Sequence, residues 1–229
     1  MSVNTLEPHP TVIVFDVNET LSDLSPMADR FADLGAPTTL AKQWFAAVLR
    51  DGFALTAAGG QEEFSVIAAS VLRTVLADVA LDRPTEAAVE HVMSVFTALP
   101  VHPDVADGVR ALRAAGYRLV TLSNGSASVA EQLLERAGLR DQFEALLSVE
   151  DACAWKPARV AYEHAARQCG VAAGELMLVA VHPWDIDGAG RAGLSTAWID
   201  RDGVPYPSFW TAPTCMVGGL DELPAALAR

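Results

Sequence analysis

Residues 11–23 read TVIVFDVNETLSD and contain the feature that decides the fold, a short apolar run that ends at a carboxylate. The run at 12–15 is β-branched or aromatic throughout, which is typical of a strand buried on both faces of a parallel sheet. Asp16 follows at the carboxyl end of this strand. Ligands bind at that edge of open α/β sheets, because the loops leaving the strands form a crevice there. Asp16 is therefore a candidate active-site residue, although an aspartate after a strand can also simply cap a turn.

The composition is that of an ordinary globular protein. The 229 residues are 51% hydrophobic and 20% charged, which is enough for one substantial core with or without a smaller attached unit. The net charge of −13 argues against nucleic acid or an anionic membrane surface as a partner, because lysine and arginine supply those contacts. A small anionic substrate can still bind where positive groups converge.

The cysteines and the apolar segments bear on the cellular compartment. Cys153, Cys169 and Cys215 are odd in number and form no CxxC pair, so we expect neither a disulfide framework nor a structural zinc site. Residues 1–10 lack a basic region and an apolar signal core, and no later segment reaches the apolar length of a membrane span. We expect a soluble cytoplasmic protein in a reducing compartment.

Hydrophobic periodicity divides the chain into a helical block and an alternating part. Helices are predicted over residues 26–34, 39–50, 62–79 and 85–98. Pro100 and Pro103 then indicate a linker back to the sheet. Strands are predicted at 117–122, 145–149, 176–181, 196–199 and 216–217, and helices at 104–115, 126–137, 158–169, 186–192 and 220–228.

This order of elements predicts a doubly wound, Rossmann-like α/β core with a parallel sheet and an inserted helical cap. The core domain is expected to comprise residues 1–21 and 99–229, and the cap domain residues 22–98. A cap over the strand ends can exclude water and hold a small substrate above Asp16.

Polar side chains follow three more of the predicted strands. Each has an unremarkable explanation: Ser126 or Ser128 is a helix N-cap, a lysine before a proline is usually solvated, and a histidine or tryptophan can be simple packing. Convergence on one sheet edge is stronger evidence than any single residue. The candidates are Ser123 and Asn124, then Lys156 with Tyr162, and then His182, Trp184 and Asp185.

Four stretches in order resemble the haloacid dehalogenase (HAD) superfamily, and within it the L-2-haloacid dehalogenases of type II. They are FDVNETL at 15–21, LSNGS at 122–126, KPARVAY at 156–162 and VHPWDIDGA at 181–189. The similarity covers nearly the whole chain, cap included. It implies a HAD-like fold, no cofactor and a homodimer.

Two positions separate this chain from the magnesium-dependent phosphatases of the superfamily. Those enzymes resemble DxD at the first motif, whereas this chain has Asn18, which cannot deliver a proton to a leaving group. Val181 stands where a phosphatase has a magnesium-binding aspartate, and its side chain has no oxygen for a hard cation. A site without metal is expected.

The resemblance implies a set of catalytic roles. Asp16 would attack the carbon that bears the halogen and form an aspartyl ester, which water then hydrolyses. Lys156 would keep Asp16 ionised and Thr20 would orient it. Ser123 would hold the substrate carboxylate, and Asp185 would be the base or orienter for the hydrolytic water.

The resemblance also implies contacts to substrate and halide. Lys42 and Arg50, eight positions apart and so roughly on one helical face, are the candidates for a halide-binding cation on the cap. Glu19, Ala180 and His182 depart from familiar members, so water activation is expected to differ. The full predicted binding set is Asn18, Asn124, Tyr162, His182, Trp184, Lys42 and Arg50.

Three readings of the function stay open at this point. The first is metal-independent hydrolysis of short (S)-2-haloalkanoic acids to (R)-2-hydroxy acids. The second is a phosphatase or another hydrolase that uses the same aspartate, including defluorination or hydrolysis of a strained-ring carboxylate. The third is a binding protein that keeps the fold without the chemistry, because fold alone does not determine function.

Overall fold

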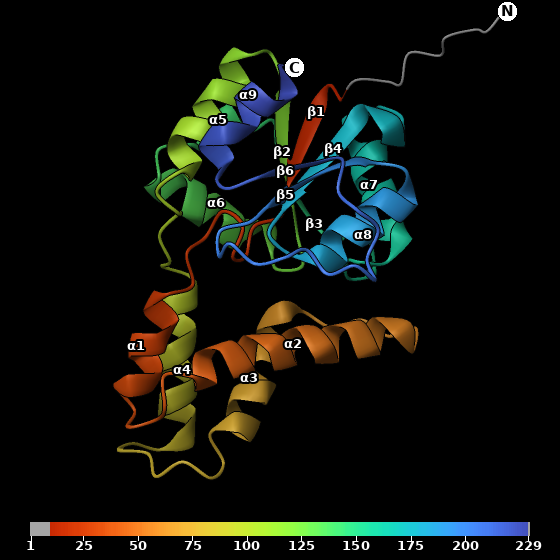
Figure 1. Cartoon of the computed structure of the whole chain (residues 1–229). Helices are drawn as coiled ribbons and strands as arrows, with labels where there is room; N and C mark the ends of the chain where they lie inside the picture. The colour runs from red at the N-terminus through yellow and green to blue at the C-terminus, as the bar shows by residue number, and fades with distance from the viewer. Residues whose placement is uncertain (1–9, 229) are drawn as a thin grey trace, which may run out of the picture.

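A computed structural model describes residues 10–228 and has a six-stranded parallel sheet at its centre (Figure 1). The strand order is β3-β2-β1-β4-β5-β6, and each neighbouring pair is parallel. The strands are β1 Val12–Phe15, β2 Arg118–Ser123, β3 Ala145–Ser148, β4 Leu176–Ala180, β5 Ser195–Ile199 and β6 Cys215–Val217. The predicted parallel α/β fold is confirmed.

Strand β1 lies in the middle of the sheet and is completely buried, as its apolar run predicts. Phe15 pairs in register with Thr121 of β2 and Val179 of β4. The chain runs outward from β1 to β2 and β3, and then returns to β4 on the other side of β1. The sheet therefore has its topological switch point between β1 and β4, where ligands bind in open α/β sheets.

Helices cover both faces of this sheet (Figure 1). On one face, Ile13 and Phe15 pack with apolar residues of α5, α6 and α9. On the other, Val12 and Val14 belong to the cluster that contains residues of α7 and α8. These helices are α5 Val105–Ala114, α6 Ala127–Arg136, α7 Arg159–Cys169, α8 Pro183–Ala192 and α9 Leu223–Leu227.

Four further helices, inserted between β1 and β2, lie together on one side of the sheet domain (Figure 1). Trp44 is fully buried among them and donates a hydrogen bond from Nε1 to the carbonyl of Ala68 at 3.0 Å. The helices are α1 Pro26–Ala32, α2 Leu40–Ala57, α3 Phe64–Val75 and α4 Thr85–Phe96. The exact division at residues 22 and 98 stays a prediction, and residues 1–9 of the expected core lie outside the described residues.

Helix α2 is longer than predicted, and the reason is a contact with the core. The prediction ended this helix at residue 50, just before Asp51 and Gly52, but the helix continues to Ala57. A Cβ at Gly52 would lie 2.4 Å from the ring of Trp155, so the missing side chain makes room for this close approach. Trp155 also donates from Nε1 to the carbonyl of Glu62 at 3.1 Å, which joins the loop before α7 to the inserted helices.

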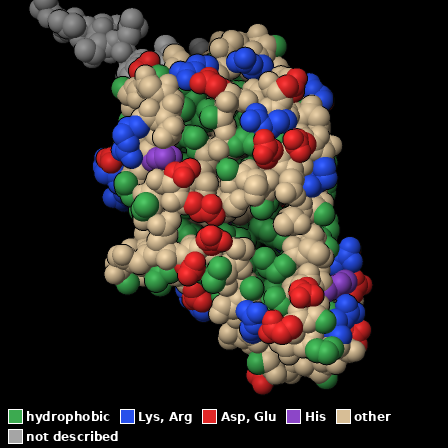
Figure 2. All heavy atoms as spheres, turned by 180° about the vertical axis from the view of Figure 1, so that it is seen from behind, with side chains coloured by type: hydrophobic (Ala, Val, Ile, Leu, Met, Phe, Trp, Pro, Cys, Tyr) green, Lys and Arg blue, Asp and Glu red, His purple; other side chains and the backbone are tan. Residues whose placement is uncertain are grey.

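Other boundaries differ in smaller ways. Helix α8 begins at Pro183 rather than 186, because proline is well suited to the first turn of a helix. The last predicted helix divides into a 3₁₀ turn, Leu220–Glu222, and the short α9. On the face shown in Figure 2, acidic and basic side chains are interspersed. No helix within residues 10–228 is long and apolar enough to cross a membrane.

Candidate active site

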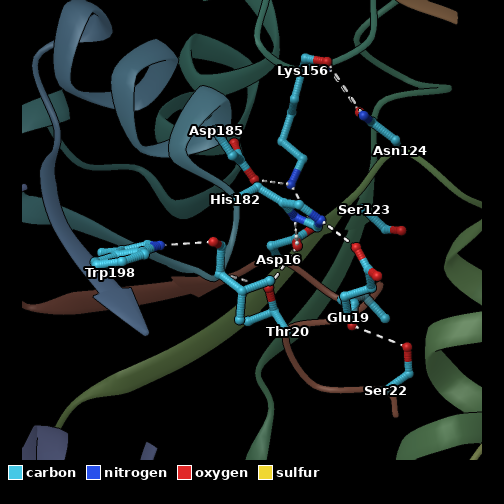
Figure 3. Close-up of polar contacts among 12 residues, drawn as sticks. Asp16, Glu19, Thr20, Ser22, Ser123, Asn124, Lys156, His182, Asp185 and Trp198 are labelled. Atoms are coloured by element: carbon cyan, nitrogen blue, oxygen red, sulfur yellow. Dashed lines mark hydrogen bonds and ion pairs between the residues drawn. The ribbon is translucent and has the colours of Figure 1, made fainter. Parts of the chain in front are cut away.

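Asp16 lies at the carboxyl end of β1 with both carboxylate oxygens engaged (Figure 3). Oδ1 accepts a hydrogen bond from Lys156 Nζ at 2.8 Å, and Oδ2 accepts one from Thr20 Oγ1 at 2.7 Å. His182 Nδ1 is 3.1 Å from Oδ2. Because these partners come from the loops after β1, after β3 and after β4, the fold itself assembles the site.

Lys156 is completely buried between two carboxylates. Its Nζ lies 2.6 Å from Asp185 Oδ2 in addition to its contact with Asp16. Tyr162 donates from its hydroxyl to the other oxygen of Asp185, Oδ1, at 2.6 Å. Asp185 is itself 0% exposed and in contact with Lys156; its predicted role as the base or orienter for water stays a prediction.

The backbone of Lys156 is held by Asn124, which directly follows β2. The amide N–H of Lys156 donates to Asn124 Oδ1 at 2.9 Å, and Asn124 Nδ2 donates to the carbonyl of Lys156 at 3.3 Å. Both ends of the Asn124 amide thus bind the Lys156 backbone, an arrangement that positions the lysine. A contact of Asn124 with halide or substrate stays a prediction.

The charges determine the protonation state of the nucleophile. Burial alone would raise the pKa of Asp16, but Lys156 and His182 outweigh it and hold that pKa well below its ordinary value. Burial lowers the pKa of Lys156, and the two flanking carboxylates raise it further than burial lowers it. At neutral pH the site thus contains an ionised carboxylate beside a charged lysine, which suits nucleophilic attack.

Ser123, Asn18 and Phe64 come together at the Gly125 turn. A Cβ on Gly125 would lie 3.4 Å from Ser123 Oγ, 4.0 Å from Asn18 Nδ2 and 4.0 Å from the Phe64 ring. Ser123 Oγ also accepts the amide N–H of Gly125 at 2.9 Å. As predicted, Ser126 is the N-cap of α6, with its hydroxyl accepting the amide N–H two residues on.

A cleft of about 690 Å³ lies between the inserted helices and the sheet domain. Lys42 and Phe45 line it from α2, and Glu19, His182 and Arg201 line it from the sheet domain. The predicted cap cation Lys42 therefore faces the cleft.

Arg50 is placed elsewhere. Its side chain is 72% exposed and pairs with the neighbouring Asp51 at 2.8 Å, and it is not among the described residues that line the cleft. The helix turns this side chain toward solvent, which favours Lys42 over Arg50 as the halide-binding cation; that role stays a prediction. Trp184 packs its ring against His182 and Phe53, with both pairs of ring centroids 4.9 Å apart.

Comparison with known proteins decides the family. The model of the haloacid dehalogenase-like hydrolases matches residues 10–193. The chain belongs to this family. Haloacetate dehalogenase H-2 of Moraxella sp. (strain B) is 34% identical over 128 residues, which are 56% of this chain and 57% of that protein. (S)-2-haloacid dehalogenase 4A of Burkholderia cepacia is similarly matched over 61% of its length.

Longer matches extend over nearly the whole haloacid dehalogenase-like chain. An (S)-2-haloacid dehalogenase of Pseudomonas putida is 27% identical over 213 residues, 92% of this chain and 93% of that protein. A solved dehalogenase structure with an intermediate complex superposes with a TM-score of 0.89 at 28% identity, covering 97% of this chain and 99% of its own. The complete architecture, inserted helices included, is thus shared with a solved dehalogenase.

Glu19 is a residue of this haloacid dehalogenase-like hydrolase that the sequence analysis noted as a departure from familiar members but did not include among the site residues. Its Oε2 lies 2.8 Å from His182 Nε2, so the imidazole bridges Glu19 and Asp16 (Figure 3). Burial lowers the pKa of His182, but hydrogen bonds to the two carboxylates outweigh burial and raise it to about 9. In the sequence Glu19 is only an acidic residue three positions after Asp16. Its place in the site depends on contact with His182, which follows β4 and is 163 positions away.

Proposed function

We propose that the protein hydrolyses short (S)-2-haloalkanoic acids to (R)-2-hydroxy acids. The observation that carries this proposal is the buried Asp16 carboxylate, held ionised by Lys156 and oriented by Thr20, with Asn18 two residues on. The printed names of several relatives support the same reaction, since they are (S)-2-haloacid and haloacetate dehalogenases.

The proposed reaction has two steps. An Asp16 oxygen displaces halide from C2 of the substrate, which breaks the carbon–halogen bond and forms an aspartyl ester. Water then adds to the carboxyl carbon of Asp16 and releases the hydroxy acid. Since C2 undergoes a single displacement, its configuration inverts. Splitting one hard displacement into two easier steps is the advantage of a covalent intermediate.

The proposed reaction needs no metal ion. Lys156 Nζ lies 2.8 Å from Asp16 and 2.6 Å from Asp185, so an ammonium group already places a positive charge beside both carboxylates. The Asn18 amide is too weak an acid to protonate a phosphate ester's leaving oxygen, which disfavours the phosphatase alternative. Chelator is expected to leave halide release unchanged.

Substrate recognition is assigned to groups around the cleft. We propose that Ser123 and neighbouring backbone N–H groups hold the substrate carboxylate, and that Lys42 supplies the positive charge toward the halide. Residues 22–98 would act as the cap. We further propose a cytoplasmic homodimer: the three cysteines are free, which suits a reducing compartment, and dimerisation follows the family resemblance.

Halide release from a panel of 2-chloro, 2-bromo and fluorinated acids, with and without chelator, tests the proposal. We expect chloride and bromide release from 2-haloacids of S configuration, and none from Asp16→Asn. Mass spectrometry of the Asp16 peptide after rapid quenching should detect the ester. Full turnover by Asp16→Asn would refute the mechanism. Magnesium-dependent release of phosphate from phosphate esters would instead favour a phosphatase. If the protein turns over neither haloacids nor phosphate esters, a binding protein is favoured.

A further inference from the structure

The two proposed steps place different demands on the site. Displacement of halide requires an ionised Asp16, whereas hydrolysis of the ester requires a group that accepts a proton from water. We propose that His182, held by Glu19, is this proton acceptor. The inference rests on the proposed ester mechanism and assigns its second step to residues outside the lysine cluster.

Asp185, the base or orienter suggested by the sequence, is poorly placed to accept that proton. Its Oδ2 is occupied by Lys156 Nζ at 2.6 Å and its Oδ1 by the Tyr162 hydroxyl at 2.6 Å. Its side chain is 0% exposed, and Lys156 Nζ contacts both this carboxylate and that of Asp16 (Figure 3). A base must be within hydrogen-bond reach of the proton that it removes, whereas Asp185 is completely buried and each of its oxygens already accepts a hydrogen bond from the protein.

His182 meets the geometric requirement. Its Nδ1 is 3.1 Å from Asp16 Oδ2, so a water molecule approaching the Asp16 carboxyl carbon comes within reach of the imidazole. Its side chain is 12% exposed, and it lines the cleft from which water enters. Within residues 10–228, His182 thus both contacts Asp16 and lines the cleft.

The surrounding residues fix the orientation of the imidazole. Just before His182, the amide N–H of Val181 donates to Thr20 Oγ1 at 3.1 Å, and Trp198 Nε1 donates to the Val181 carbonyl at 2.7 Å. The imidazole packs nearly parallel to the ring of Trp184, with centroids 4.9 Å apart. These contacts leave Nδ1 directed at Asp16 and Nε2 directed at Glu19.

Glu19 is a positioning residue with an unusual backbone. Its φ is +61°, in the left-handed region that non-glycine residues seldom adopt, and His102 Nε2 lies 3.0 Å from its carbonyl oxygen. A strained conformation persists where the surrounding structure holds it, and such residues gather at functional sites. The result is a carboxylate, 39% exposed, that contacts His182 Nε2 at one end and the cleft at the other.

The proton balance of the cycle closes with these groups. In the resting site His182 is protonated between Asp16 and Glu19. Ester formation removes the negative charge of Asp16, so the pKa of His182 falls and its Nδ1 proton is released to water in the cleft, while Nε2 keeps its proton toward Glu19. Neutral Nδ1 then takes a proton from the attacking water. The intermediate expels the alkoxide, which takes the proton of the new carboxyl group, and the Asp16 carboxylate and protonated His182 are restored.

The test separates the two steps with 2-chloropropionate as the substrate. In His182→Gln we expect a burst of about one chloride per enzyme at near the wild-type rate, followed by steady turnover reduced about 10²- to 10⁴-fold. The ester on the Asp16 peptide should accumulate in this variant. Asp202→Asn, which removes an exposed acid from the same cleft, is the matched control and should behave as wild type.

Glu19→Gln provides a second readout that a merely structural role would not move. The rate of ester hydrolysis should rise with pH as His182 loses its proton in the ester state. The titratable and charged residues that line the cleft together with His182 are Glu19, Asp23, Lys42, His102, Asp200, Arg201 and Asp202. Among the described residues, the charged side chains within hydrogen-bond distance of the imidazole are Glu19 and Asp16. Removing the Glu19 charge should move the inflection of the hydrolysis rate to lower pH. Glu19→Asp keeps a carboxylate, so its inflection should lie between those of Glu19→Gln and wild type.

Three outcomes would overturn the assignment. If His182→Gln slows the chloride burst and hydrolysis equally, the imidazole only positions the nucleophile. If the burst occurs without accumulation of ester, another group accepts the proton. If the wild-type enzyme releases no halide from any acid, the proposed function fails, and the assignment of His182 and Glu19 fails with it. This outcome differs from the other two because no chloride burst is observed.

Discussion

Replacement of Lys156 by methionine tests the balance of charge inside the site. Methionine has a similar length and keeps the apolar packing of the stem, but it removes the ammonium that lies 2.8 Å from Asp16 and 2.6 Å from Asp185. Both carboxylates are then buried without their shared cation. Asp16 keeps its contacts with Thr20 and His182, and Asp185 keeps its contact with Tyr162.

The expected loss of stability is large. Removing one partner of a buried ion pair costs about 3–5 kcal/mol, because the remaining charge is left uncompensated. For a chain of this size 1 kcal/mol shifts the melting temperature by about 2–4 °C, so Lys156→Met should melt about 6–20 °C below wild type near pH 7.5. Urea unfolding followed by circular dichroism, together with thermal melts, measures the change.

The loss should depend on pH in a direction that the site determines. In wild type the pKa of Asp16 is depressed, so its contribution is present above its ordinary value of 3.8 and lost as pH falls. In Lys156→Met, burial acts on both carboxyls without the lysine that lowers their pKa values. A carboxyl group whose pKa is higher in the folded than in the unfolded protein loses its proton more readily on unfolding, so stability falls as pH rises toward the folded pKa. The difference between wild type and variant should therefore widen from pH 5 to pH 8.

Asp185→Asn in the Lys156→Met background is the matched control. It removes one of the two uncompensated charges, so it should recover about 1–3 kcal/mol, and the double-mutant cycle isolates the coupling. A stability gap between Lys156→Met and wild type that is the same at pH 5 and pH 8 would refute the reasoning, because a loss of packing alone does not titrate.

Two further substitutions probe the contacts around this centre. A Cβ at Gly188 would lie 2.7 Å from the Tyr162 hydroxyl, so Gly188→Ala should lower the free energy of unfolding, measured in urea, by about 1–3 kcal/mol. Gly190→Ala is the control: the nearest contact of its Cβ is at 3.9 Å, so it should be neutral or slightly stabilising. Equal effects of the two substitutions would contradict the packing argument. Thr20→Val keeps the shape but loses the hydrogen bond to Asp16, so single-turnover chloride release should slow about 10- to 100-fold, and an unchanged rate would exclude an orienting role.

Much of the fold follows from patterns that are local in the sequence. An apolar run that ends at Asp16 predicts a buried central strand, and the later alternation of strands and helices predicts a parallel sheet. Where such a sheet forms, the carboxyl ends of its strands share one edge. For that reason the sequence pattern predicts Lys156, Asn124 and His182 as neighbours of Asp16.

Helix length is one place where the local pattern was insufficient. Asp51 and Gly52 are typical of a helix end, yet α2 continues past them because Gly52 packs against Trp155 from a distant loop. The position of Arg50 depends on the same geometry. Helical spacing puts Lys42 and Arg50 on roughly one face, but only the tertiary arrangement determines which of them faces the cleft.

Sequence patterns were enough to predict the class of sheet, the position of Asp16 at the end of its central strand, and a lysine and an asparagine at the same edge. The tertiary structure alone decided that Asn124 holds the Lys156 backbone, that Asp185 is fully occupied and that Glu19 reaches His182. The reason is physical: periodicity and residue type report burial and secondary structure. A hydrogen bond between residues 163 positions apart depends instead on strand register and on a strained loop conformation that no local pattern encodes.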